Sequence, residues 1–166
     1  RQLLYGGDEG ADAAAQLYVA LNNAVLDSGP RGMTVNTHVC RGNFHSTWAA
    51  SGGYAPVSKI LFQQERVDGY YLEFDDERSG GFEPLADLAE GKIVVLGLIT
   101  SKRPQLEEKQ HIKERILEAA QYVPLDRLCL SPQCGFASTE EGNKLTEADQ
   151  WKKLALIREI AEEIWG

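Results

Sequence analysis

Apolar residues recur along the chain with two periods, one typical of helices and one typical of buried strands. Segment 11–26 has apolar residues at helical spacing and is followed by Ser28-Gly29-Pro30, which is a helix-ending signal. The run 93–98 consists of β-branched residues, leucine and glycine, as in a parallel strand that is buried on both faces. The same pattern along the chain predicts helices at 11–26, 55–65, 82–90, 105–120 and 146–165, and strands at 33–40, 69–74, 93–98 and 127–131. Thr146 and Asp149 form a capping-box-like start of the last helix, with Asp in place of Glu.

The order of these elements is one helix followed by four βα units. Strands that alternate with helices pair in parallel through right-handed crossovers. Four such units make the α/β architecture of half a (β/α)8 TIM barrel, which is the fold we predict. An open parallel sheet with helices on both faces is the alternative that the pattern leaves open.

Composition narrows the range of functions. The chain has 166 residues, of which 43% are hydrophobic, so it can form a core as one domain or as part of a larger barrel. A net charge of -8 without a cluster of Lys and Arg argues against a nucleic-acid partner. No apolar run approaches the roughly 20 residues that span a membrane, and no secretory signal opens the chain. We therefore expect a soluble cytoplasmic protein without a membrane partner.

The start of the chain suggests that a part is missing. The first residue is Arg1, and the only methionine, Met33, lies well inside. We therefore interpret residues 1–166 as the C-terminal half of a barrel whose N-terminal half is absent from this chain.

Four side chains with metal-binding chemistry fall at the predicted carboxyl ends of strands. His38 and Cys40 lie two apart in one strand and therefore project to the same face. Glu73 ends an otherwise apolar strand, and Cys134 follows the last strand. In a parallel barrel these ends share one rim, where active sites lie, so the four residues together predict a zinc site. For Glu73 alone, an ion pair with Arg78 or Lys102 is the competing explanation.

The motifs around these residues carry a family resemblance. Segments 37–40 (THVC), 72–73 (LE) and 131–135 (SPQCG) resemble the zinc motifs of cobalamin-independent methionine synthase, and segment 124–136 is the most telling stretch. The sequence as a whole is closer to those of the short, single-barrel bacterial relatives in that family. The resemblance covers nearly the whole chain, but it corresponds only to the C-terminal four strands of the catalytic barrel.

The resemblance implies a zinc-dependent methyltransferase that moves a methyl group to a thiol such as that of homocysteine, with a methylated folate as a candidate donor. It implies His38, Cys40, Glu73 and Cys134 as the zinc ligands, with Glu73 also in a catalytic role as the ligand that substrate displaces. Two departures concern substrates. Thr100 stands where the family carries a proton-donating histidine, and the acidic residues that hold the amino acid's ammonium group lie upstream of Arg1. We therefore expect the isolated half barrel to be inactive.

The other polar and aromatic residues are assigned simpler roles. We expect Cys129 to pack in the core, and Trp151 and Trp165 to pack against the barrel wall. His45 is expected in a surface loop and His111 on the exposed side of a helix. Arg41 and Asn43 are weaker candidates for contact with an anionic group, and the acidic, glycine-rich segment 75–81 reads as a mobile loop at the rim.

Two other functions compete with this one. The first is a non-catalytic half barrel with a structural or vacant zinc site, which self-associates into a homo-oligomer through its exposed sheet edges. The second is a zinc methyltransferase that takes its methyl group from a donor other than folate.

Overall fold

The computed structural model describes residues 7–137 and 139–166. Its α-helices are α2 (Asp8–Asp27), α3 (Ser58–Gln64), α4 (Lys109–Ala119) and α5 (Glu147–Trp165); its 3₁₀ helices are η1 (Glu77–Ser79), η2 (Glu83–Asp87) and η3 (Leu125–Arg127); and its strands are β1 (Asn36–Val39), β2 (Gly69–Glu73), β3 (Ile93–Ile99) and β4 (Leu128–Pro132). All predicted elements are present in the predicted order, although several are shorter.

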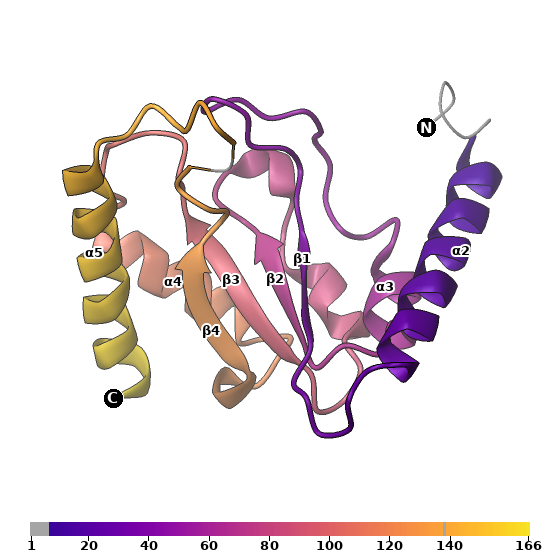
Figure 1. Ribbon diagram of the computed structural model, residues 1–166. Helices are drawn as coiled ribbons and strands as arrows, with labels where there is room; N and C mark the ends of the chain where they lie inside the picture. Colours follow the sequence, from indigo (N-terminus) through magenta and orange to yellow (C-terminus); the bar gives the residue numbers. More distant parts are fainter. Residues whose placement is uncertain (1–6, 138) are drawn as a thin grey trace.

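The four strands form one parallel sheet in the sequential order β1-β2-β3-β4. The helices α3 and α4 lie behind the sheet in Figure 1, while α2 stands beside β1 and α5 beside β4. A doubly wound sheet reverses its strand order at a switch point and carries helices on both faces. The observed order has no reversal, so the half-barrel prediction is confirmed and the open doubly wound alternative is wrong.

The core lies between the sheet and the helices behind it. Tyr70, Leu72, Val94 and Leu96 alternate with residues of the opposite face, and each has at most 1% of its surface exposed. Around them the aromatic rings of the core pack edge to face or tilted, for example Phe62 against Tyr70 with ring centroids 5.1 Å apart. These contacts fix the helices to one side of the sheet.

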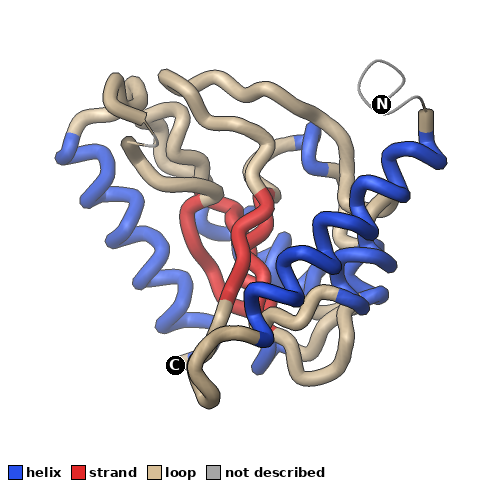
Figure 2. Tube along the Cα trace, turned by 45° about the vertical axis from the view of Figure 1, so that its right-hand side comes forward, coloured by secondary structure: helices blue, strands red, loops and turns tan. Residues whose placement is uncertain are grey.

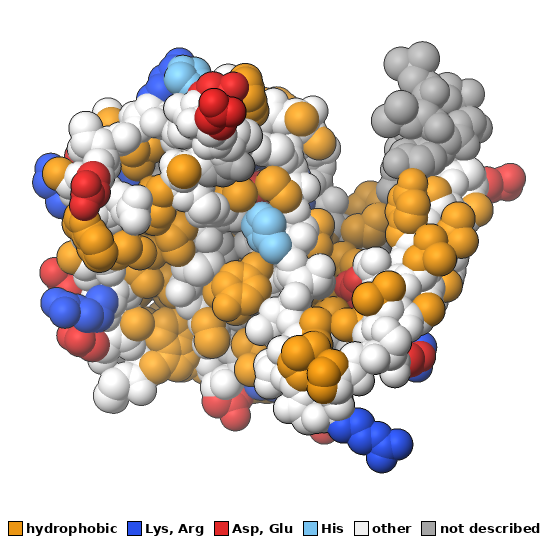
Figure 3. Space-filling view, viewed as in Figure 1, with side chains coloured by type: hydrophobic (Ala, Val, Ile, Leu, Met, Phe, Trp, Pro, Cys, Tyr) orange, Lys and Arg blue, Asp and Glu red, His pale blue; other side chains and the backbone are white. Residues whose placement is uncertain are grey.

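The opposite face of the sheet is open. His38, Tyr71, Val95 and Cys129 form one row in register across the four strands, and Tyr71 is 41% exposed. Hydrophobic side chains gather over this face in Figure 3. Cys129 is exposed here, so the prediction that it packs in the core is wrong. Alternation along β4 turns Leu128 towards the helices and Cys129 away from them.

Several helices and strands begin or end at other residues than predicted, for local reasons. The helix predicted at 105–120 begins only at Lys109, because Glu108 is its N-cap and accepts hydrogen bonds from the backbone of Gln110 and His111. The helix predicted at 82–90 is the short 3₁₀ helix η2. The strand predicted at 33–40 pairs with β2 only over Asn36–Val39.

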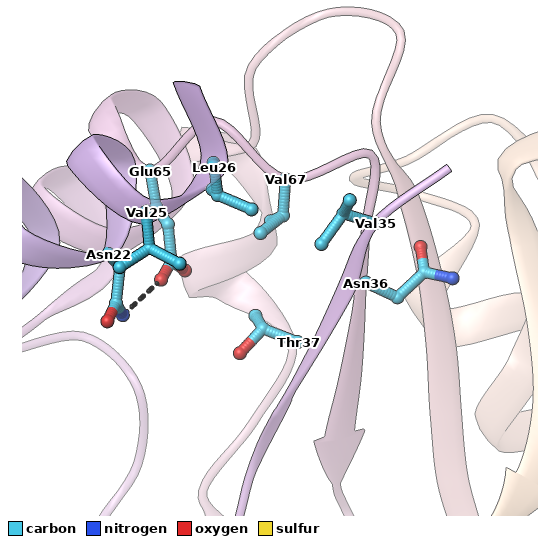
Figure 4. Close-up of a pocket in the computed structure, with 8 residues that line it drawn as sticks. All are labelled: Asn22, Val25, Leu26, Val35, Asn36, Thr37, Glu65 and Val67. Atoms are coloured by element: carbon cyan, nitrogen blue, oxygen red, sulfur yellow. Dashed lines mark hydrogen bonds between the residues drawn. The ribbon is translucent and has the colours of Figure 1, made fainter. Parts of the chain in front are cut away.

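The free edge of β1 faces α2. Between them is a pocket of about 230 Å³, drawn in Figure 4. Its wall combines apolar side chains of α2 and those of Val35 and Val67 with Glu65, which accepts a hydrogen bond from Asn22 at 2.8 Å. Outward-facing Leu17, Tyr18 and Leu21 of α2 are each more than half exposed. The tube in Figure 2 shows α2 running along this side of the sheet, away from the main core.

The helix α5 begins with the predicted capping box. The Thr146 hydroxyl accepts from the Asp149 backbone, and the Asp149 carboxylate accepts from the Thr146 backbone. Trp165 packs against the core and donates to the carbonyl oxygen of Leu125 at 2.9 Å. Trp151 is 60% exposed and donates to Glu147 on its own helix, so its predicted packing against the barrel is wrong.

We predict that Thr146→Ala lowers the free energy of unfolding by about 1 kcal/mol, because it removes the side-chain acceptor of the α5 cap. Urea denaturation followed by circular dichroism measures the change. Thr34→Ala, an exposed threonine outside the helices and strands, serves as the control and should be within about 0.5 kcal/mol of the parent chain. Equal stability of the two variants would contradict the capping role.

Candidate metal centre

Three strands deliver the candidate ligands to one rim of the sheet. His38 lies in β1 and Cys40 directly follows it, Glu73 is the last residue of β2, and Cys134 comes two residues after β4. The strands are parallel, so their carboxyl ends meet on the same side. The structure therefore brings together all four residues that the sequence singled out, although 94 positions separate Cys40 from Cys134.

The four side chains are spaced as ligands of one ion would be. One donor atom from each lies within 4.8 Å of the others. The Cys40 and Cys134 sulfurs are 3.9 Å apart, Cys134 Sγ is 3.7 Å from His38 Nε2, and Cys40 Sγ is 3.5 Å from Glu73 Oε1. Ligands at zinc distances of about 2.0–2.3 Å in a tetrahedron are roughly 3.3–3.8 Å from one another. This donor set therefore fits zinc in both chemistry and spacing.

The histidine is oriented by the neighbouring strand. Its Nδ1 lies 3.2 Å from the carbonyl oxygen of Tyr71. With the proton on Nδ1, the ring donates to that carbonyl and directs Nε2 towards Cys134. A backbone acceptor on the second ring nitrogen is the usual way in which a metal-binding histidine is fixed.

The two sulfurs differ in acidity. A hydrogen bond with His38 lowers the pKa of Cys134 to about 7, against a smaller opposing effect of burial. For Cys40, burial raises the pKa to about 11, and the nearby Cys134 and Glu73 add to the rise. The same hydrogen bond to Cys134 raises the pKa of His38. In the metal-free chain the pair His38 and Cys134 therefore favours a thiolate beside an imidazolium.

Glu73 is completely buried and held by its backbone as well as by its side chain. Its N–H donates to the Tyr54 hydroxyl at 2.8 Å, and its carbonyl oxygen accepts from Arg41 at 3.2 Å. Carboxylate oxygen Oε2 accepts from the backbone N–H of Arg41 at 3.2 Å and lies 3.8 Å from Arg78 Nη2. The ion pair with Arg78 that the sequence suggested is thus present beside the sulfur cluster. Lys102 pairs instead with Asp75, at 2.8 Å.

The loop after β1 is built around Arg41. Its guanidinium stacks on the Tyr54 ring at 4.1 Å, donates to the Tyr54 hydroxyl at 2.8 Å and donates to the carbonyl of Gly52 at 3.0 Å. Asn43 is likewise buried, and its amide donates to Ser101 and to the carbonyl of Gly135. These donors are used within the protein, so the suggestion that Arg41 and Asn43 contact an anionic ligand gains no support.

Sequence reasoning missed Tyr54 and the positioning roles of Arg41 and Arg78. A tyrosine in a glycine-rich connection gives no signal that its hydroxyl contacts a strand 19 positions later. Segment 75–81 does lie at the rim, but η1 and ion pairs of Arg78 with Asp75 and Asp76 fix it. Its contacts are those of a structured turn, whereas its composition suggested a mobile loop. His45 and His111 are exposed, as predicted.

Thr100, directly after β3, is 3% exposed. Its side chain contacts Asp75, which Lys102 also approaches. Burial alone would raise the pKa of Asp75, but the hydrogen bond and charge of Lys102 outweigh it and lower that pKa. Next to Thr100, the chain thus presents the anionic carboxylate of Asp75, paired with Lys102.

The absence of a side chain at Gly97 allows the neighbouring strands to approach closely beside the site. Gly97 is in register with Glu73 on one side and Ser131 on the other. A Cβ atom added here would lie 2.7 Å from both the carbonyl oxygen of Leu72 and Cα of Gln133. Beside it, a cavity of about 280 Å³ is lined by His38, Tyr71 and segment 131–135. Two of the candidate ligands, His38 and Cys134, therefore border this cavity.

Comparison with known proteins assigns the chain to a family. Residues 7–163 match the model of the cobalamin-independent synthase catalytic domain. The chain belongs to this family. This confirms the resemblance inferred from the motifs, and it agrees with methyl transfer as the family's chemistry.

Two relatives of the synthase family come from Bacillus subtilis. The chain is 53% identical to its YxjG protein over 156 residues and 54% identical to its YxjH protein over 146 residues. These matches cover 93% and 87% of this chain, but only 41% and 38% of the two relatives. The chain therefore spans about two fifths of the length of the curated relatives that it matches.

Solved structures of the family show the same half barrel. A protein from Listeria monocytogenes, described as a candidate vitamin-B12 independent methionine synthase, superimposes with a TM-score of 0.71 at 39% identity, over 92% of this chain and 41% of that one. A B12-independent methionine synthase from Shewanella, in complex with selenomethionine, gives 0.67 at 21% identity, over 91% of this chain and 46% of that one. The second likeness bears on the fold alone. Within the described residues, no helix is both long and apolar enough to cross a membrane.

We predict that Cys134 is the first cysteine to be alkylated in the metal-free chain. Its pKa is lowered to about 7, so its thiolate population, and with it the iodoacetamide rate, rises through pH 7 and levels off above it. Cys40, at about 11, and the exposed Cys129, whose pKa burial raises, stay protonated there. Peptide mass spectrometry after timed alkylation separates the three.

His38→Gln should shift the midpoint for Cys134 upward, because the variant loses the imidazolium partner. Prior alkylation of Cys40 or Cys129, or an unchanged midpoint in the His38 variant, would contradict the assignment.

Proposed function

We propose that this chain carries the metal-binding half of a zinc-dependent methyltransferase that transfers a methyl group to a thiol such as homocysteine. The observation that supports it best is the set of four donor atoms within 4.8 Å, contributed by His38, Cys40, Glu73 and Cys134. Family membership supplies the reaction class. Zinc, when bound, would hold the substrate sulfur as a thiolate at neutral pH, and the thiolate is the nucleophilic form.

The protein groups suit this role through their charge. Two cysteinates balance a divalent cation, so a further anionic ligand, either the Glu73 carboxylate or the substrate thiolate that replaces it, makes the set of ligands net anionic. Electron density therefore stays on an incoming sulfur, which favours its attack on a methyl carbon. Glu73 is the ligand that we propose to be exchanged, since a catalytic site keeps one position open to substrate. The cavity beside His38 and Tyr71 provides a route to that position.

The second substrate and the rest of the barrel belong to the same proposal. We propose a methylated folate as methyl donor, bound largely by strands that complete the barrel between the free edges of β1 and β4. Thr100 cannot donate a proton as a histidine would, so proton delivery would fall to another group. Assay of the protein with its barrel complete, with methylated folate, methylcobalamin and a methylated thiol supplied separately, distinguishes a folate enzyme from a methyltransferase with another donor.

The main rival is a non-catalytic half barrel that self-associates. The open sheet face, with Tyr71 and Ile93 each more than 40% exposed, favours it, as do the two sheet edges. Size-exclusion chromatography at several concentrations, together with metal analysis, separates the two functions. A stable dimer in which metal is absent, or is inaccessible to thiols, would support the rival.

We predict that the purified chain binds about one zinc ion, which fits a site of four protein ligands. Cys40→Ser and Cys134→Ser should each abolish stoichiometric binding, as measured by elemental analysis after dialysis. Cys129→Ser is the matched control, because Cys129 is a free, exposed cysteine outside the cluster. Zinc retained in both ligand variants, or lost in the Cys129 variant, would refute the assigned ligand set.

We predict that Glu73→Gln slows thiol methylation by at least about tenfold, which is the smaller effect seen when groups around a catalytic metal are changed. The neutral amide keeps the shape of the side chain but weakens the ligand. Methylation is measured in the protein with its barrel complete, and circular dichroism checks the fold. A variant that methylates at the parent rate would show that Glu73 has no role in activating the thiol.

A further inference from the structure

Arg78 approaches Oε2 of Glu73, whereas Cys40 lies near the other carboxylate oxygen, Oε1. Arg78 belongs to η1, the 3₁₀ turn that follows β2, and its side chain is only 7% exposed. Nε donates to both carboxylate oxygens of Asp76, at 2.9 and 3.0 Å, and Nη2 donates to Asp75 at 3.2 Å. The indole ring of Trp48 covers the guanidinium at 5.2 Å. The position of this cation is therefore fixed by partners other than Glu73.

This guanidinium retains unused donor capacity. Nη1 is buried and has no hydrogen-bond acceptor among the described residues. Nη2 lies 3.8 Å from Glu73 Oε2, which is an ion-pair distance but longer than a hydrogen bond of about 2.7–3.2 Å. A buried N–H without an acceptor is unfavourable, so the guanidinium has donor capacity left for a carboxylate that comes within hydrogen-bond distance.

Glu73 lies between this cation and the sulfur cluster. Its other oxygen, Oε1, is 3.5 Å from Cys40 Sγ. The backbone of Glu73 is tied to Tyr54 and Arg41, so motion is left to the side-chain torsions. A side-chain rotation that moved the carboxylate oxygen Oε2 by roughly 1 Å would exchange the contact of Glu73 with Cys40 for a hydrogen bond with Arg78.

We propose that Arg78 is a positioning residue that receives the Glu73 carboxylate when a substrate thiol takes its place among the ligands. The inference rests on the proposed function. Glu73 has no exposed surface, so a carboxylate that left a metal without meeting another cation would be a buried, unpaired charge, which is costly. Arg78 removes that cost. It lowers the free energy of the state with Glu73 displaced, while competing for Glu73 in the state without thiol.

The experiment measures metal affinity and thiol affinity separately. Zinc affinity is determined by competition with a chromophoric chelator. Thiol affinity is determined on the cobalt(II)-substituted chain, with 2-mercaptoethanol as the probe and the sulfur-to-cobalt absorption band as the signal. In Arg78→Gln we expect zinc to bind at least as tightly as in the parent chain, because a nearby cation is gone. Thiol binding should weaken by about tenfold or more.

Lys102→Gln is the matched control. The side chain of Lys102 is about as buried as that of Arg78, with 9% against 7% of its surface exposed. Both side chains pair with Asp75, but only Arg78 also pairs with Glu73. The Lys102→Gln substitution removes one positive charge beside the same Asp75. The thiol affinity of this variant should therefore stay within about threefold of the parent value, well short of the tenfold loss expected for a group that contacts a ligand. Arg78→Lys keeps the charge without the fork of donors and should restore most of the lost thiol affinity.

A double variant tests whether Arg78 affects thiol binding through Glu73. In the Glu73→Gln background the displaced side chain carries no charge, so adding Arg78→Gln should leave thiol affinity unchanged. Equal weakening of zinc and thiol binding in Arg78→Gln would indicate a purely structural role and overturn the proposal. So would an effect of Lys102→Gln as large as that of Arg78→Gln, no effect in Arg78→Gln, or a loss of thiol affinity in Arg78→Lys as large as that in Arg78→Gln. A parent chain that binds neither zinc nor cobalt would refute the proposed function and, with it, this inference.

Discussion

The rest of the site depends on the burial of one carboxylate. Glu73 ends the second strand without any exposed surface, between two thiols on one side and a guanidinium on the other. A charge in that position needs cations or hydrogen-bond donors around it. The backbone N–H of Arg41, the side chain of Arg78 and the candidate metal position are the groups that the fold supplies. Much of the chain between β1 and β3 serves to place them.

This requirement explains why the connections on both sides of β2 are so closely tied to its end. The long connection after β1 folds back, so that Tyr54 and Arg41 bind the main chain of Glu73. The short turn after β2 folds over, so that Arg78 is held by Asp75 and Asp76. Lys102, from the connection after β3, balances the charge of Asp75. Charge balance at the rim is thus shared among three loops that leave neighbouring strands.

The two faces of the sheet have different functions in this architecture. The helix-covered face supplies stability through residues such as Tyr70 and Leu96, which are fully buried. The open face presents Tyr71 and Cys129 in the same row as the candidate ligand His38. Residues of a barrel interior lie on such a face, and the relatives are more than twice as long as the part matched here. The candidate metal position lies beside this open surface, at the carboxyl ends of the strands.

The sequence by itself determined the order of the elements, the parallel half barrel and the four candidate ligands. These follow from local periodicity, and a period of two fixes which strand residues share a face, as for His38 and Cys40. Residues on different strands could then be placed at one rim because parallel strands end on the same side. The family motifs added the reaction class.

Tertiary structure alone decided the surroundings of those ligands. The bond from Tyr54 to Glu73, the stacking of Arg41 and the position of Arg78 depend on how loops fold back in three dimensions, and no local period encodes that. The predicted packing of Cys129 and Trp151 failed for the same reason. A pattern states which side of a strand or helix a residue takes, whereas burial depends on whether another element covers that side.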